Sequence, residues 1–287
     1  MGRDEERRDL TRLVEALAEQ GGAIARRTRH TLTEADVLEA IATTLQAGGV
    51  EFVRRYNRLE IEAHEPPEDG PLLFVANHGF GGIFDLNVFA LIAALTDMGL
   101  ERPVTFLVHE IAWTLRVGAL IEPLGARPAS HDAAREAVER GEHVVVLPGG
   151  DVDGGKSFRH RNTIMFAGRT GFARLATELG TPIVPVVTAG AGETLFVLSS
   201  GRRLARLLRL DRLLRVKAVP ISVSLPWGVS IGAVGLLPYF PLPSKLRTRV
   251  LAPVDPRDAA TVEDLADDVV AAMQATLDEL SALPSWR

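Results

Sequence analysis

The chain has 287 residues, of which 46% are hydrophobic, and a formal net charge of -5 at pH 7. This length and composition suffice for the core of one large α/β enzyme domain. The negative charge and the lack of zinc-finger, helix-turn-helix or P-loop motifs argue against general nucleic-acid binding, so we expect no nucleic-acid partner. The absence of cysteine excludes disulfides and cysteine catalysis, and it fits an intracellular protein.

Residues 1–60 are predicted to form an N-terminal helical region ahead of a catalytic domain over residues 61–287. Residues 1–12 are highly charged and no apolar stretch of secretory type follows, so we expect no signal peptide and a protein that stays inside the cell. A helix is predicted to begin at Thr33, which forms a capping-box pattern with Asp36. Abundant arginine and alanine with little lysine indicate a bacterial source.

The stretch Asn77-His78-Gly79-Phe80-Gly81-Gly82-Ile83-Phe84-Asp85 joins a predicted strand over residues 72–76 to a predicted helix over residues 85–98. Histidine titrates near neutral pH and can act as a general base, and a carboxylate bonded to its second nitrogen fixes the tautomer. His78 and Asp85 are therefore candidate catalytic residues. The alternative is that His78 caps the turn and Asp85 caps the following helix.

Strands and helices alternate through the next part of the chain. The pattern predicts strands over residues 103–108, 143–147 and 182–188 and helices over residues 110–117, 131–140, 168–179 and 261–280. Such alternation indicates an α/β fold with a mixed, largely parallel sheet flanked by helices on both faces. Ligands of these sheets bind at the carboxyl ends of the strands, where His78 and Gly149-Gly150 fall.

Three blocks resemble the glycerol-phosphate and lysophospholipid acyltransferase family over about residues 50–255. They are Asn77-His78 with Asp85, the strand that ends in Pro148-Gly149-Gly150, and the proline-containing strand Pro182-Ile183-Val184-Pro185-Val186. The stretch from Gly168 to Ala176 resembles the subgroup in which Pro-Gly-Gly replaces Pro-Glu-Gly, which is related to diacylglycerol acyltransferase-like proteins.

The chain departs from the family pattern in two places. Six residues separate His78 from Asp85 where the family has four, and the glycines of this turn allow the extra residues to loop out. Gly149 and Val152 stand where the family commonly has a glutamate and a phosphate-binding arginine. Guanidinium and ammonium groups bind phosphate, so the substitutes are basic residues of the next loop and helix, with a solvated basic loop as the alternative. These residues are Lys156, Arg159, Arg161 and Arg169.

Residues 202–243 carry a pattern typical of a membrane surface. Arginine and leucine interleave over residues 202–217, which predicts a basic amphipathic helix, and a charge-free stretch with Trp, Tyr and Phe follows over residues 218–243. Prolines in that stretch break any single spanning helix. We therefore expect a cytoplasmic protein bound peripherally to the inner face of the cell membrane. The alternative is a core helix whose arginines point into water.

The resemblance implies an acyltransferase of phospholipid biosynthesis that moves a fatty acyl group from acyl-CoA or acyl-carrier protein to a hydroxyl of a lipid acceptor. His78 would take the proton, Asp85 would orient His78, and N–H groups of Gly81-Gly82 or Gly149-Gly150 would stabilise the oxyanion. A thioester is already activated, so we expect neither a metal nor an organic cofactor. Two alternatives stay open, a thioesterase or esterase with the same His/Asp pair and a noncatalytic lipid-binding protein.

Overall fold

The structure of the protein is a computed structural model that describes residues 33–65, 70–80, 85–114, 117–209, 219–232 and 239–284. Two compact units divide the chain, residues 1–41 and residues 42–287. The helix α2 (Glu34–Arg55) begins in the first unit and ends in the second. Its start has the predicted capping box, because the Thr33 N–H donates to Asp36 Oδ2 at 2.7 Å and the Asp36 N–H donates to Thr33 Oγ1 at 3.2 Å.

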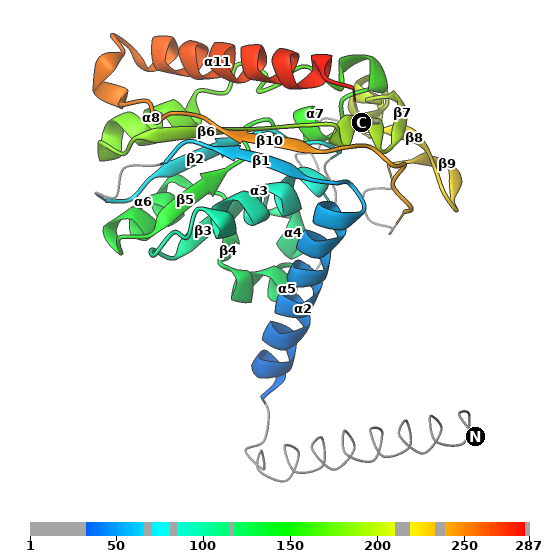
Figure 1. The fold of residues 1–287 in the computed structure, drawn as a ribbon, viewed down its shortest axis with the longest axis horizontal. Helices are drawn as coiled ribbons and strands as arrows, with labels where there is room; N and C mark the ends of the chain where they lie inside the picture. Colours follow the sequence, from blue (N-terminus) through cyan, green and yellow to red (C-terminus); the bar gives the residue numbers. More distant parts are fainter. Residues whose placement is uncertain are drawn as a thin grey trace, which may run out of the picture. The chain divides into compact units, whose positions relative to one another are not determined.

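A mixed, largely parallel sheet forms the centre of the second unit, which confirms the predicted fold class (Figure 1). In the described residues its strand order is β1-β10-β6-β2-β5-β3-β4, and only the pair β6 and β10 is antiparallel. The strands are β1 (Glu60–Ala63), β2 (Leu73–Ala76), β3 (Val104–Val108), β4 (Ala126–Pro128), β5 (His143–Val146), β6 (Ile183–Ala189) and β10 (Arg247–Val250).

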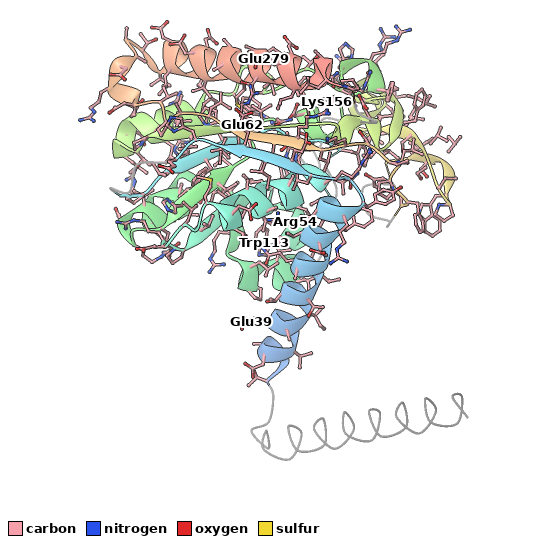
Figure 2. All side chains as sticks on the ribbon, viewed as in Figure 1. Glu39, Arg54, Glu62, Trp113, Lys156 and Glu279 are labelled. Carbon is pink, nitrogen blue, oxygen red and sulfur yellow. The ribbon has the colours of Figure 1, made fainter. Side chains whose placement is uncertain are left out.

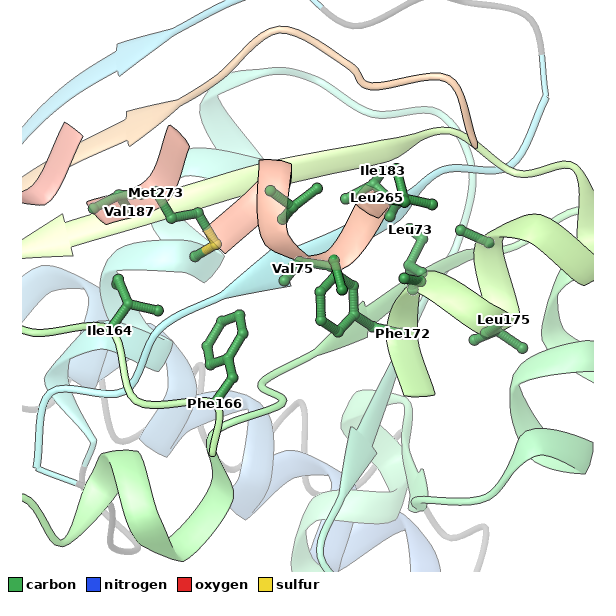
Figure 3. Packing of buried hydrophobic residues seen from close by; sticks show 14 of the residues in the cluster. Leu73, Val75, Ile164, Phe166, Phe172, Leu175, Ile183, Val187, Leu265 and Met273 are labelled. Carbon is green, nitrogen blue, oxygen red and sulfur yellow. The ribbon is translucent and has the colours of Figure 1, made fainter. Parts of the chain in front are cut away.

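Helices cover both faces of this sheet, as predicted. The first face packs on α6 (His131–Glu139), α8 (Gly171–Leu179) and α11 (Val262–Ala282), and the opposite face packs on α3 (Leu86–Asp97). Successive side chains of a strand point to opposite faces, so β2 contributes Leu73 and Val75 to the first cluster (Figure 3) and Phe74 to the second. A strand buried on both faces reads as a continuous apolar run, as β2 does.

Between the strands lie short helices that place the connecting loops. The region predicted as one helix over residues 110–117 holds α4 (Ile111–Thr114), and α5 (Gly118–Ile121) follows it. Further short helices of the described residues are α7 (Gly150–Gly154), η1 (Glu122–Leu124), η2 (Phe158–His160), η3 (Ala191–Glu193) and η5 (Pro256–Asp258).

The predicted helix over residues 202–217 is shorter in the structure. The helix α9 spans Arg202–Leu207, and Arg209 has a left-handed backbone with φ of 54°, a conformation that ends a helix. Residues 210–218 lie outside the described part of the chain. Within the described residues, no helix has both the length and the apolar character required to cross a bilayer.

A second sheet takes two of its strands from the charge-free stretch. It is antiparallel, with the order β7-β8-β9, and its strands are β7 (Phe196–Ser199), β8 (Ile221–Ser224) and β9 (Gly228–Ile231). The hairpin of β8 and β9 comes from residues that the sequence pattern singled out only as apolar and proline-rich. The backbone hydrogen bonds of β8 and β9 run from strand to strand, unlike the bonds within a single helix that spans a membrane.

Candidate active site

His78 and Asp85 meet across the turn that follows β2. The distance from His78 Nδ1 to Asp85 Oδ2 is 2.6 Å. Asp85 is buried, and its other oxygen, Oδ1, accepts a hydrogen bond of 2.9 Å from the Asn87 N–H at the start of α3. The carboxylate thus caps the helix and binds the imidazole at the same time, so the two roles considered for Asp85 from the sequence are compatible.

The imidazole of His78 is oriented by its contact with Asp85. A carboxylate accepts hydrogen bonds, so the nitrogen that faces Asp85, Nδ1, carries the proton and Nε2 has its lone pair available. The His78 side chain is 18% exposed, whereas that of Asp85 is 3% exposed. The imidazole is therefore partly exposed, while the carboxylate that binds it is kept away from water.

Asn77 ties the end of β2 to β6. Its side chain donates from Nδ2 to the Thr188 carbonyl at 3.0 Å and accepts at Oδ1 from the Thr188 N–H at 2.9 Å. Asn87 Nδ2 donates to the Asn77 carbonyl at 3.0 Å. A Cβ on Gly79 would lie 2.5 Å from Ala191 Cβ, so the chain can pass here only as glycine. These contacts fix the backbone on both sides of His78.

The Pro148-Gly149-Gly150 turn lies at the carboxyl end of β5, the strand next to β2. Arg169 Nη1 donates to the carbonyls of Pro148 and Gly149 at 2.7 and 2.6 Å, and its Nη2 lies 3.3 Å from Asp151 Oδ1. The Gly150 N–H donates to the Leu147 carbonyl at 3.1 Å. Arg169 therefore holds the turn together, and the Gly150 N–H is hydrogen-bonded within the turn.

The other basic candidates lie in different surroundings. Lys156, labelled in Figure 2, is buried. Its Nζ lies 2.8 Å from Asp153 Oδ1. Arg161 stacks over the Phe158 ring at 4.2 Å from the centroid, and Arg159 is exposed. The two oxyanion candidates Gly81 and Gly82 lie outside the described residues.

Asp153 is a site residue that the sequence patterns did not indicate. Its side chain is fully buried, and its Oδ2 accepts a hydrogen bond of 2.7 Å from the His78 N–H. An acidic residue three positions before a lysine is common on solvated surfaces, so the sequence carried no signal for this contact.

Tyr239 is a second residue that the sequence patterns missed. Burial raises the pKa of its hydroxyl to about 12, the Asp85 charge adds to the rise, and a hydrogen bond with Thr194 opposes it. The phenol is therefore protonated at neutral pH. Its ring meets Phe80 edge to face at 6.1 Å between the centroids, so Tyr239 packs against the second residue after His78.

Metal ligands are not gathered in the described parts of the chain. No group of three or more His, Asp or Glu residues there is arranged to hold a metal ion.

Comparisons with known proteins bear on the chemistry of this site. Residues 58–189 match a family model described as Acyltransferase, a segment that includes His78, Asp85 and the Pro148-Gly149-Gly150 turn. A sequence search of curated proteins gives no significant match.

The fold is also similar to that of a solved enzyme, the 1-acyl-sn-glycerophosphate (LPA) acyltransferase PlsC from Thermotoga maritima. The TM-score is 0.50 and the sequence identity is 16%, and the match covers 92% of this chain and 90% of that chain. The family match supports an acyltransferase, and the likeness to PlsC shows a shared fold.

Proposed function

We propose that the protein is an O-acyltransferase that moves a fatty acyl group from a thioester, acyl-CoA or acyl-carrier protein, to a hydroxyl of a glycerolipid or related lipid. The observation that carries this proposal is the 2.6 Å contact of His78 Nδ1 with Asp85 Oδ2 inside the segment that matches the acyltransferase family. No residue of the chain has to form an acyl intermediate in this reaction, because His78 activates the acceptor directly.

In the proposed mechanism, His78 Nε2 takes the proton of the acceptor hydroxyl while that oxygen attacks the thioester carbonyl. Asp85 stabilises the imidazolium that forms. The tetrahedral intermediate collapses, the carbon–sulfur bond breaks, and the leaving thiolate recovers a proton from His78. Backbone N–H groups of Gly81-Gly82 or of Gly149 are the proposed oxyanion donors, because the Gly150 N–H already donates to the Leu147 carbonyl. The thioester supplies the activation, so the mechanism requires neither a metal nor an organic cofactor.

We also propose that the enzyme works at the inner face of the cell membrane and binds it through residues 202–243. The support comes from an inverted pattern in the second sheet. Phe196, Val223 and Val229 are cross-strand partners and all three are exposed. Ser222 and Ser224, which flank Val223 on β8, are buried. A sheet that faces water normally has the opposite arrangement, with its apolar residues inward.

Positive charge accompanies this apolar face. The exposed arginines of α9 and of the residues that follow it come directly after β7, and they suit an anionic lipid surface. They are Arg202, Arg203, Arg206 and Arg209. The inward side of β7 also packs near the site, since Val197 clusters with Phe80, two residues after His78. A lipid bound at this surface would therefore be delivered close to the imidazole.

Lipid-product analysis tests the proposed function. The purified protein is incubated with matched panels of acyl-CoA or acyl-carrier protein donors and hydroxylated lipid acceptors, with His78→Ala as the control. An acylated lipid that depends on both substrates and on His78 is the expected product. Free fatty acid alone would assign a thioesterase or esterase instead, and lipid binding without either product would assign a noncatalytic lipid-binding protein.

A further inference from the structure

We propose that Asp153 and Lys156 form a buried clamp on the backbone of His78 and act as positioning residues for the general base. This inference rests on the proposed acyl transfer for its kinetic consequences, while the clamp itself is a matter of geometry. Both side chains lie out of water, with exposed fractions of 0% for Asp153 and 2% for Lys156.

The clamp holds His78 at both of its backbone polar groups. Asp153 Oδ2 accepts the His78 N–H at 2.7 Å, and Lys156 Nζ donates to the His78 carbonyl at 3.1 Å. The two side chains are joined to each other, because Lys156 Nζ donates to Asp153 Oδ1 at 2.8 Å. The residue that carries the imidazole is thus held between the ends of one ion pair, and the ring itself is held separately by Asp85.

Both members of the clamp have further hydrogen-bond partners within the protein. Asp153 Oδ1 also accepts the Met165 N–H at 3.0 Å, and Lys156 Nζ also donates to the Thr163 carbonyl at 3.1 Å. An ammonium group has three donors, and the three acceptors of Lys156 use all of them. A buried lysine with no donor to spare has nothing to offer the phosphate of a substrate, so its role is positional.

Gly149 makes room for this arrangement. A Cβ on Gly149 would lie 2.1 Å from Asp153 Cβ and 3.1 Å from the Met165 carbonyl oxygen. A glutamate at position 149 could not coexist with Asp153 in this place. The Pro-Gly-Gly sequence and Asp153 therefore belong together, and Asp153 supplies a buried carboxylate beside the His78 turn from a position four residues later.

Energetics explains why the pair must be tested as a unit. Removing one member of a buried ion pair leaves an uncompensated charge and is strongly destabilising, while replacing both members by neutral groups is often tolerated. The informative variant is thus Asp153→Asn with Lys156→Met, which leaves no unpaired charge and removes the donor to the His78 carbonyl.

The measurement compares this double variant with wild type in steady-state transfer kinetics after thermal melting has confirmed folding. We expect kcat to fall about 10- to 100-fold, as for a small misplacement of a catalytic group, and KM for both substrates to stay within about twofold. The matched control is Arg54→Met with Asp97→Asn, which removes an exposed ion pair of 2.6 Å elsewhere and should leave both constants unchanged.

Three outcomes would overturn the proposal. An unchanged kcat in the folded double variant would make the pair merely structural, and a raised acceptor KM with unchanged kcat would make Lys156 a substrate ligand. Hydrogen exchange in the wild-type protein tests the contact itself without any variant, because the clamp predicts that the His78 amide exchanges as slowly as the Phe74 amide of β2. Fast exchange at His78 would show that the buried contact with Asp153 does not persist.

The proposed function and the clamp can fail separately. If the wild-type protein transfers no acyl group, the NMR signal of the His78 Nδ1–H still reports on the clamp. That signal should shift or broaden in the Asp153→Asn, Lys156→Met variant and stay unchanged in the Arg54→Met, Asp97→Asn control. An unchanged signal in the clamp variant would count against the clamp whatever the reaction is.

Discussion

His78 is held by two buried carboxylates, with Asp85 on its ring and Asp153 on its backbone, while Nε2 is left for a substrate. The first prediction concerns the imidazole ring of His78. His78→Ala removes the group that takes the acceptor proton, so we expect turnover to fall by about two to four orders of magnitude in a purified transfer assay. The fold should survive, and a folded His78→Ala variant with wild-type turnover would remove the mechanism.

The variant Asp85→Asn tests the contact between His78 and Asp85 by changing the carboxylate. An asparagine still caps α3, so the melting temperature should change little. The amide cannot stabilise an imidazolium and can leave the ring in the wrong tautomer, so turnover should be severely impaired. Wild-type turnover in a folded Asp85→Asn variant would show that the carboxylate is not needed to orient or stabilise the imidazole.

His143 gives the protein a pH-dependent stability. It is buried in β5, where its Nδ1 accepts the Leu72 N–H at 3.1 Å, and burial together with the nearby Arg102 charge lowers its pKa below the ordinary value of 6.5. The unfolded chain therefore binds a proton here at a higher pH than the folded chain does. The stabilisation is fully present above pH 6.5 and is lost as the pH falls from 6.5 towards the lower pKa of the folded state.

The expected slope is at most about 1.4 kcal/mol of unfolding free energy per pH unit in that window. Urea denaturation at a series of pH values between about 7.5 and 5 measures it. His143→Asn keeps an acceptor for Leu72 and does not titrate, so its stability should depend less on pH. Equal slopes for the variant and wild type would show that His143 is not the responsible group.

Two adjacent glycines of α2 lie in different surroundings, so we expect alanine to change the stability of the protein in opposite directions at the two positions. A Cβ on Gly48 would meet nothing within 4 Å, whereas a Cβ on Gly49 would lie 2.3 Å from the Phe89 ring of α3. Gly48→Ala should stabilise the protein by about 0.5–1 kcal/mol, because alanine is the better helix former. Gly49→Ala should destabilise it by about 1–3 kcal/mol through overpacking. Urea denaturation of the two variants compares them, and equal effects would contradict the packing of α2 on α3.

The apolar sheet face and the arginines beside it predict how the protein binds vesicles. Replacing Arg206, Arg209 and Arg212 by Gln should release it from anionic vesicles, since each basic residue near the surface contributes about 1 kcal/mol before screening by salt. Val229→Ser with Ile231→Ser should weaken binding also at high salt, because these side chains are exposed on β9. Co-sedimentation measures both effects.

The matched control for the arginine variant removes three arginines from other exposed positions, Arg135, Arg140 and Arg257, again by substitution with Gln. It changes the net charge equally and should bind as wild type does. If both triple variants bind alike, the arginines of residues 202–212 are ordinary surface residues.

Periodicity predicted most elements because their side chains alternate between buried and exposed environments. The buried run of β2 and the turn after it were sufficient to place His78 at a sheet edge near Asp85. The end of α9 was not predictable in the same way, since the Arg/Leu pattern continues past Leu207 while the backbone of Arg209 turns left-handed. The clamp could not be predicted either, because Asp153 and His78 are 75 positions apart and no local pattern links them.

The basic residues near the Pro148-Gly149-Gly150 turn bear on which lipid acceptor the whole molecule uses. Lys156 and Arg169 are engaged by carboxylates and carbonyls around the Pro148-Gly149-Gly150 turn, and Val152 is buried. A phosphomonoester would therefore have only Arg159 and Arg161 as basic partners among the described candidates. We expect a competition assay to show a preference for monoacylglycerol over lysophosphatidate.

A preference for lysophosphatidate would be tested again in variants of the loop arginines. A strong preference for lysophosphatidate that disappears in Arg159→Gln with Arg161→Gln would assign the phosphate to the loop arginines and defeat the neutral acceptor. A preference that survives those changes would contradict both a neutral acceptor and phosphate binding by Arg159 and Arg161. It would require a phosphate site that none of these residues provides.

The double use of Asp85 has an evolutionary consequence. Because one oxygen caps α3 and the other binds His78, an exchange of Asp85 for Asn or Ser keeps the helix start and discards the chemistry. A lineage could therefore pass from enzyme to lipid-binding scaffold by a single substitution, without an unstable intermediate on the way. Within such a lineage, the residue at position 85 would separate the catalysts from the pseudoenzymes where overall similarity would not.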